Sequence, residues 1–392
     1  MPAPLVYSPF AYEIHEDPYP TYARLRDEAP AYYNPDLDFW ALSRFDDVHA
    51  AMQDWVTYSS AEGVSLEQGS TARPPMIIAM DPPRQQKLRK LVSKAFTPRR
   101  VATMEPHIRT LTRTYLEPLL SRGTCDFIQD FGAKLPMDVI SKMMGVADED
   151  QDMLRGWADA VLHREEGKAD IPKEGLEASG NLVRYFATDL ARRRQRPGDD
   201  LISALTLAEV DGERLTDAEI IGFCFLLVIA GNETTTKMLG NAIVLLARHL
   251  DQRAWLLANP ARIADAVEEV VRYDNSSQML ARVLTRDVAL HGRTMQAGKK
   301  VVLLVGSANR DERVFERPDA FDVRRAPKAS LAFGYGIHVC LGASLARLEG
   351  RVALEEVLPR IADYEVDESG LVRVHSANVR GYSTVPIRFA PT

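Results

Sequence analysis

The fold of this chain is decided by ten residues near its C-terminus, Phe333-Gly334-Tyr335-Gly336-Ile337-His338-Val339-Cys340-Leu341-Gly342. A single cysteine lies near the end of a glycine-rich loop, and residues 343–349 after it have the pattern of a helix. Because a helix N-terminus favours an anion, we expect it to lower the pKa of the Cys340 thiol and to keep the thiolate, which binds metals. The glycines let the backbone approach a flat ligand closely. The loop therefore predicts a metal–thiolate centre, and the alternative is a structural cysteine in a turn.

Length and composition are those of a globular protein: 392 residues, of which 46% are hydrophobic and 26% charged. No shift in composition marks a boundary, so we expect one large domain over residues 1–392. The net charge of -7 argues against general nucleic-acid binding, which needs a basic surface. The cysteines, Cys125, Cys224 and Cys340, are too few and too scattered for a disulfide framework or a zinc cluster, which favours a reducing compartment.

The first residues show no basic segment followed by an apolar one, so we expect no signal peptide. The longest apolar stretch, Ile220–Ala230, is far shorter than the roughly 20 residues of a membrane span. These features predict a cytoplasmic protein without a membrane span.

One long helix is expected in the middle of the chain. Thr216 and Glu219 have the spacing of a capping box, flanked by Leu215 and Ile220 in the positions of a hydrophobic staple. The helical pattern runs to about Leu250 and is apolar nearly all round between 223 and 230, which predicts burial through the core. Strand-like segments are few and short, so the fold class is mainly α with small β-sheets. The expected strands lie at 39–43, 288–290, 299–305 and 385–389.

Within that helix lies the polar run Ala230-Gly231-Asn232-Glu233-Thr234-Thr235. Glycine inside a helix costs about 1 kcal/mol relative to alanine, and a buried acid needs partners or water. Both costs are explained if the helix opens locally to admit a small ligand and water. The alternative is a glycine needed for packing beside an acid that faces the surface.

Both stretches resemble motifs of the cytochrome P450 family. The cysteine loop is similar at every fixed position to its haem-thiolate loop, Phe-Gly-x-Gly-x-His-x-Cys-x-Gly, and 230–235 resembles its oxygen-activating motif. The resemblance covers nearly the whole chain. It implies a single helix-rich domain with haem b between the central helix and the helix after Cys340. It also implies a monooxygenase that inserts one atom of dioxygen into a lipophilic small molecule, by hydroxylation or epoxidation.

The resemblance assigns residues to the cofactor. Cys340 would be the axial iron ligand, Thr234 would stabilise the iron-bound oxygen, and Glu233 would help to relay protons. Arg89, Arg282 and His338 would hold the haem propionates, together with Gln85, which stands where many relatives have histidine. Glu269, Arg272 and Arg325 would form a structural ion network beneath the loop. Further cofactor contacts would come from Phe333, Gly334, Gly336, Gly342, Ala230 and Gly231.

Pocket residues follow from position along the chain. The loop 63–78 is expected to form a lid, and Asn275-Ser276-Ser277 departs from the common Ser-Pro-Val of the family. The side chains expected to face the substrate are Leu226, Ile229, Gln278, Leu280, Asn378 and Val379.

Between Arg84 and Arg100 the chain has seven basic residues and no acid. A charge run is usually a solvated face, but the resemblance places this one where an acidic ferredoxin would dock, around Lys87, Lys90 and Lys94. Electrons would then come from NAD(P)H through a ferredoxin reductase and the ferredoxin. The alternatives are a peroxide-driven haem enzyme that needs no redox partner, and a haem-based sensor or carrier without turnover.

Overall fold

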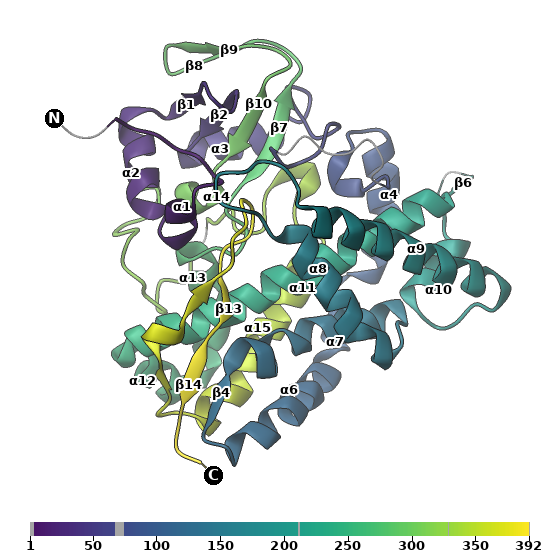
Figure 1. Cartoon of the computed structure of the whole chain (residues 1–392), viewed down its shortest axis with the longest axis vertical. Coiled ribbons are helices and arrows are strands. Elements are labelled where there is room, and N and C mark those ends of the chain that lie inside the picture. The colour runs from purple at the N-terminus through teal and green to yellow at the C-terminus, as the bar shows by residue number, and fades with distance from the viewer. Residues whose placement is uncertain (1–3, 67–73, 211, 328, 392) are drawn as a thin grey trace.

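The computed structural model describes residues 4–66, 74–210, 212–327 and 329–391. Its organising element is α11, Asp217–Arg248, which runs through the middle of the molecule (Figure 1). The predicted capping box is present, because the Glu219 N–H donates to the Thr216 hydroxyl at 3.2 Å and the Thr216 N–H donates to the Glu219 carboxylate at 2.9 Å. Leu215 and Ile220 beside it are buried. The long buried helix predicted from the sequence is confirmed.

Six helices form the main body around α11. Thr103 and Met104 separate the short helix α5, Pro98–Ala102, from α6. The helices that pack on α11 include α7, α8, α9, α13 and α15. Their bounds are α6 Glu105–Leu120, α7 Lys134–Met144, α8 Gln151–Leu162, α9 Lys173–Gln195, α13 Ile263–Tyr273 and α15 Ala343–Arg360.

The remaining helices are short and lie toward the edges of the molecule or around the sheet (Figure 1). They are α1 Tyr12–Glu16, α2 Tyr19–Glu28, α3 Phe45–Gln53, α4 Arg84–Val92, α5 Pro98–Ala102, α10 Leu201–Leu207, α12 Leu250–Ala258 and α14 Val305–Ala308.

The largest sheet has five strands in the order β1-β2-β10-β7-β3. All neighbours are antiparallel except β10 and β2. In this register Arg282 on β7 lies opposite Val301 on β10, which fixes the arginine within a sheet. The strands are β1 Ala31–Asn34, β2 Phe39–Leu42, β3 Tyr58–Ser59, β7 Leu280–Leu284 and β10 Lys300–Leu303.

The other sheets are smaller. One has the order β11-β14-β4, and three are pairs, β12-β13, β5-β6 and β8-β9. The mainly α fold class with small sheets is confirmed, and one domain over 1–392 stays a prediction. The bounds are β4 Thr124–Asp126, β5 Glu209–Val210, β6 Glu213–Arg214, β8 Val288–Leu290, β9 Arg293–Met295, β11 Glu365–Val366, β12 Val372–Arg373, β13 Tyr382–Thr384 and β14 Pro386–Arg388.

Among the described residues, α11 is the one helix long and apolar enough to cross a membrane. Most of it is buried inside the protein, as in the core helix of a globular fold. Its apolarity is therefore accounted for by the helices packed on it.

Candidate active site

A cavity of about 260 Å³ lies between α11 and the cysteine loop. Its walls come from α4, α11, the segment before β7, the cysteine loop and the first turns of α15. Most of its lining is apolar, with few charged groups. Of the residues predicted from the sequence, the cavity is lined by Gln85, Arg89, Leu226, Ala230, Gly231, Thr234, Leu280, Phe333, Gly334, His338, Cys340 and Gly342.

The cysteine loop is held in one conformation by its own backbone. The Cys340 N–H donates to the Phe333 carbonyl at 2.8 Å, and Gly334 and Gly336 have positive φ of 69° and 68°. A Cβ at Gly336 would lie 2.6 Å from the carbonyl oxygen of Met52, so only glycine fits there. The loop thereby presents the Cys340 thiol to the cavity at the start of α15.

The electrostatics of Cys340 differ from the sequence expectation. Burial raises the pKa of the thiol above its ordinary value, and this outweighs the backbone N–H groups of Gly342 and Ala343 and the charges of Arg89 and Arg347, which lower it. The expectation that the helix N-terminus alone sets a low pKa is therefore wrong for the protein chain by itself. Cys340 is exposed toward the cavity, where a positive metal ion is the partner that would favour the thiolate.

Polar groups beside the loop are incompletely paired within the described chain, and Arg282 Nη1 donates to the Ala281 carbonyl at 2.7 Å. Arg282 is 3% exposed, burial lowers the pKa of its guanidinium to about 10, and no carboxylate of the described residues lies within ion-pair distance. His338 Nε2 and Gln85 Oε1 are buried without a hydrogen-bond partner in the described chain. Burial, helped by the charge of Arg282, lowers the pKa of His338 to about 4.

These groups fit the two carboxylates of a haem. A buried arginine without a carboxylate is costly unless an anion joins it, and arginine binds carboxylates through its bidentate fork. Arg89 also reaches this region, because its Nη2 donates to the Val339 carbonyl at 2.6 Å. Gln85, Arg89 and His338 line the cavity with Cys340, and Arg282 lies outside its lining but close enough to His338 for its charge to lower that pKa. These residues suit the cofactor implied by the sequence.

Thr234, predicted to stabilise iron-bound oxygen, and Glu233, predicted to relay protons, lie on different sides of α11. Thr234 lines the cavity, and its hydroxyl donates to the Ala230 carbonyl at 2.9 Å. Glu233 does not line the cavity: it is buried on another side of α11, 3.0 Å from Lys237 Nζ and hydrogen-bonded to Asp159 of α8. Burial alone would raise the pKa of Glu233, but the charge of Lys237 and the hydrogen bonds to Asp159 and Lys237 together outweigh it, so the net pKa is lowered. The same burial, together with the bond to Glu233, raises the pKa of Asp159 to about 8.

Four of the residues predicted to contact substrate, Ile229, Gln278, Asn378 and Val379, lie outside the lining of the cavity. Ile229 is on a different face of α11 from Leu226 and packs into the core. Gln278 folds back, since its amide donates to the Asn275 carbonyl at 2.6 Å and lies against Gly306.

Asn378 and Val379 contribute backbone pairing behind the wall of the cavity. The Gln278 N–H donates to the Asn378 carbonyl at 2.9 Å, and Val379 forms a β-bridge with Ser277. In their place the lining includes residues that the sequence did not assign. These are Phe96, Ile140, Phe223, Leu227, Thr235, Met238, Val271, Asn275, Ser276, Ser277, Val305, Leu331, Ala332, Val339, Leu341, Leu345, Ala346 and Glu349.

The expected lid, 63–78, is described in part. Ile77 and Ile78 at its end line the cavity, while residues 67–73 lie outside the described chain. The three residues expected to form a network beneath the loop lie together. Arg272 Nε is 2.7 Å from the Glu269 carboxylate, and Arg325 Nε is 3.1 Å from it.

Part of the basic run between Arg84 and Arg100 is neutralised by an acidic residue from another element. Lys87 Nζ is 2.6 Å and Arg84 Nη1 is 2.8 Å from the carboxylate of Glu213 on β6. Lys90 and Lys94 are exposed. The local charge surplus therefore lies toward Lys90 and Lys94 rather than at Lys87.

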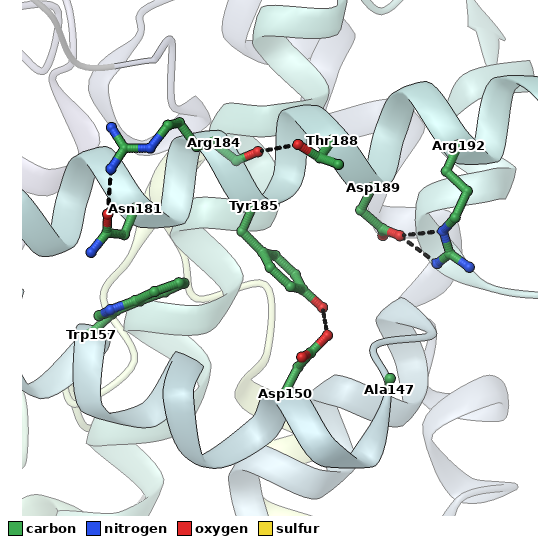
Figure 2. Close-up of a pocket in the computed structure, with 9 residues that line it drawn as sticks. All are labelled: Ala147, Asp150, Trp157, Asn181, Arg184, Tyr185, Thr188, Asp189 and Arg192. Carbon is green, nitrogen blue, oxygen red and sulfur yellow. Dashed lines mark hydrogen bonds and ion pairs between the residues drawn. The ribbon is translucent and has the colours of Figure 1, made fainter.

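A second concavity, of about 500 Å³, lies on α8, α9 and the turn before α8 (Figure 2). Its charged side chains already have partners: the Tyr185 hydroxyl donates to Asp150 at 2.6 Å, and Arg192 Nε donates to Asp189 at 3.1 Å (Figure 2). None of the residues predicted for the site lines it. The chemistry therefore belongs to the smaller cavity beside Cys340.

Known proteins resemble this chain along almost its full length. Residues 263–367 match the family model for cytochrome P450. The chain is 50% identical to the putative cytochrome P450 123 of Mycobacterium tuberculosis, with 98% of this chain and 96% of that protein covered. It is 37% identical to the vitamin D(3) 25-hydroxylase of Pseudonocardia autotrophica, with 97% and 96% covered.

A solved structure shows the same architecture. The crystal structure of CYP109E1 from Bacillus megaterium in complex with testosterone is similar with a TM-score of 0.90 and 34% identity, over 96% of this chain and 98% of that one. Identity at this level over nearly whole chains extends beyond the fold to the family. The chain belongs to the cytochrome P450 family, whose members are haem-iron monooxygenases.

Proposed function

We propose that this protein binds haem b through Cys340 and inserts one atom of dioxygen into a lipophilic small molecule, by hydroxylation or epoxidation. The observation that carries the proposal is one cavity lined by Cys340 together with His338 and Gln85, each of which has a buried polar atom without a partner in the described chain, while the buried Arg282 without a carboxylate partner lies behind its lining. A thiolate ligand and a cradle for two carboxylates are what a haem of this class requires.

The residues of this site have different proposed roles. Arg89, Arg282 and His338 hold the haem carboxylates, and Cys340 ligates the iron. When bound, the haem supplies the activation of dioxygen. Thr234 presents its hydroxyl from the α11 side, where it would donate a hydrogen bond toward dioxygen in place of the one it now donates to the Ala230 carbonyl. Apolar neighbours on α11, such as Phe223, exclude water that would divert the reaction.

The substrate is apolar with a small polar part. The apolar lining favours a lipophilic molecule, and the Ser276 hydroxyl is buried there without a hydrogen-bond partner in the described chain. Similar proteins support this size and chemistry, since one is a vitamin D(3) hydroxylase and another was crystallised with testosterone. We propose a rigid, steroid-like molecule with one hydroxyl or carbonyl group for Ser276.

Electrons come from NAD(P)H through a ferredoxin reductase and an acidic ferredoxin in the cytosol. The surface around Lys90 and Lys94 suits the ferredoxin, because these two lysines are exposed and no acidic partner is recorded for them in the described chain. Arg89, which precedes Lys90 in the chain, donates a hydrogen bond to the carbonyl of Val339, the residue before Cys340. Complementary charge at this surface would set the rate of association and its salt dependence.

The decisive experiment is the carbon monoxide difference spectrum of the reduced protein. A strongly red-shifted Soret band is expected for wild type, and Cys340→Ser is expected to lose it. Cys125→Ser and Cys224→Ser are matched controls, because both cysteines are buried away from the cavity. A band at the shorter wavelength of histidine ligation in fresh wild-type protein would refute the proposal. Product formed with peroxide but not with the ferredoxin chain would favour the peroxide-driven alternative.

A further inference from the structure

Three segments that are far apart in the sequence meet beside α1 (Figure 1). They are the N-terminal segment 7–16, the loop 163–172 between α8 and α9, and the turn 375–380 between β12 and β13. The backbone of the loop is bound to the other two: the Arg164 N–H donates to the His375 carbonyl at 2.8 Å, and the Gly167 N–H donates to the Phe10 carbonyl at 2.9 Å. The loop is therefore fixed to segments from both ends of the chain.

Three aromatic rings, of Tyr12, His15 and His375, pack together where these segments meet and are called the histidine junction below. Tyr12 stacks on His375, with ring centroids 3.6 Å apart and planes inclined by 10°. The ring of His15 lies 5.6 Å from Tyr12 and 5.8 Å from His375. The Tyr12 hydroxyl donates to the Arg164 carbonyl at 3.3 Å, so the junction also contacts the loop.

The histidine junction accommodates neutral rings and not protonated ones. His15 Nε2 lies 2.9 Å from the Pro9 carbonyl, so it carries the hydrogen, and a second proton would go to Nδ1. The Nδ1 atoms of His15 and His375 are both buried without a hydrogen-bond partner in the described chain. A buried N–H without an acceptor is costly, and two positive rings in contact with Tyr12 would also repel each other.

The charges around the junction agree with neutral rings. Burial is the main cause that lowers the pKa of His15, and the charge of Arg380 adds to it. Burial also lowers the pKa of His375, against the opposing charges of Glu16 and Glu166. The charged and titratable groups around the two rings are Glu16 of α1, His163, Arg164 and Glu166 of the loop, and Arg380, which is paired with Asp274.

The junction adjoins the wall of the cavity beside Cys340. In the turn 375–380, the Arg380 N–H donates to the carbonyl of Ser276 at 2.8 Å, and Ser276 lines that cavity. His15 and Gln278 lie on one small cavity of about 20 Å³ behind the same wall. The loop, in turn, joins α8 and α9, which both pack on α11. A movement of the loop and the turn would therefore reach two sides of the cavity.

We propose that the histidine junction is a pH-sensitive contact, which holds the loop 163–172 against the turn 375–380 at neutral pH and releases both at acidic pH, so that ligands enter and leave the cavity faster. The proton comes from solvent, and each histidine takes it up more readily once released. The junction thus contributes its full stability above about pH 6.5, the ordinary pKa of histidine, and loses it as the pH falls through the lowered values. At pH 5.5 each histidine raises the released fraction by up to about 10-fold.

Hydrogen exchange of the loop amides measures the contact directly. In wild type, the protection of the Arg164 and Gly167 N–H groups, corrected for the intrinsic effect of pH, should fall about 10-fold or more between pH 7.5 and pH 5.5. Amides of α11 between 239 and 246 should keep their protection, because the release is local. Equal protection of the loop at both pH values, or an equal loss in α11, would overturn the proposal.

A variant that cannot titrate at the junction separates protonation from other effects of acid. The double variant His15→Gln with His375→Phe retains a donor for the backbone carbonyl and a ring that stacks on Tyr12, and its loop should be equally protected at both pH values. His291→Asn is the matched control, because His291 pairs with Asp47 at 2.7 Å outside the junction, and it should behave as wild type. The wild-type loss of protection in the double variant would overturn the proposal.

Carbon monoxide binding to the reduced, haem-loaded protein tests the consequence for the cavity. It should be about 10-fold faster at pH 5.5 than at pH 7.5 in wild type and equally fast at both in the double variant; equal rates in wild type would overturn the proposal. The junction does not involve the haem, so this inference stands apart from the proposed function. If wild type gave no thiolate spectrum, the proposed function would fail, and hydrogen exchange would still decide whether the junction releases the loop.

Discussion

Removing the Glu269 carboxylate should strongly lower the free energy of unfolding of this protein, because it breaks a buried ion pair. Glu269 and Arg272 are both fully buried, and two contacts of 2.7 and 2.8 Å join them. The same carboxylate accepts from Arg325 Nε at 3.1 Å and from the Asp322 N–H at 3.0 Å. Glu269→Ala leaves the Arg272 guanidinium buried with carbonyl acceptors alone.

The expected cost follows from that uncompensated charge. Breaking a buried ion pair by deleting one partner costs about 3–5 kcal/mol. Glu268, the adjacent residue, is the matched control: it pairs with Arg347 at the surface, where the two side chains are 24% and 44% exposed. An exposed pair contributes about 0–1 kcal/mol, so Glu268→Ala should have little effect.

The assay is urea denaturation of haem-loaded protein, followed by circular dichroism and by the haem absorbance. Glu269→Ala should lower the free energy of unfolding by about 3–5 kcal/mol, and Glu269→Gln by less, because the amide still accepts a hydrogen bond. The fraction that remains folded should turn over at the wild-type kcat, since neither Glu269, Arg272 nor Arg325 lines the cavity. Equal losses for Glu268→Ala and Glu269→Ala would refute the reasoning.

Three further predictions address the site, its partner and its pH dependence. Thr234→Ala should keep substrate binding but divert electrons to peroxide; unchanged product per electron would assign that task to another group. Reversing Lys90 and Lys94 to Glu should slow ferredoxin-driven reduction more at low than at high salt, and Lys87→Glu, whose lysine is already paired, should slow it less; equal effects would contradict this surface. Burial raises the pKa of Asp138 to about 6, so its contribution to stability is full below about pH 4 and is lost as the pH rises through 6. Asp138→Asn should therefore gain about 1 kcal/mol at pH 7, after allowance for solvent screening, and less at pH 4.5; a gain independent of pH would contradict the assignment.

The sequence predicted the features that depend on neighbours along the chain. Three of these features depend only on residues close in sequence, so residue spacing predicts them. They are the capping box at Thr216, the length of α11 and the glycine-rich turn of the cysteine loop. Arg282, which the resemblance assigned to the haem propionates, is buried on β7, a strand that the sequence pattern did not predict.

Features that depend on distant contacts could not be predicted. Lys87 donates to Glu213, which is 126 residues away in sequence. The basic run contains no acid of its own, but the fold brings this acid to it. Gln278 turns back because the small residue Gly306, on a different element, leaves room for its amide. Glu233 leaves the cavity because Asp159 and Lys237 offer better partners on another side of α11. A motif fixes which residue types are near the haem but not the direction of each side chain.

Glu349 shows the same limit in the opposite direction. On α15 it stands in a series of charged residues, and nothing in the local pattern separates it from Glu355 or Glu356, which are paired with arginines. Glu356 is buried as deeply as Glu349, but it contacts Arg109 and Arg113, whereas Glu349 has no ion pair among the described residues and burial raises its pKa to about 8. The protonation state of each acid is therefore a property of the assembled helices.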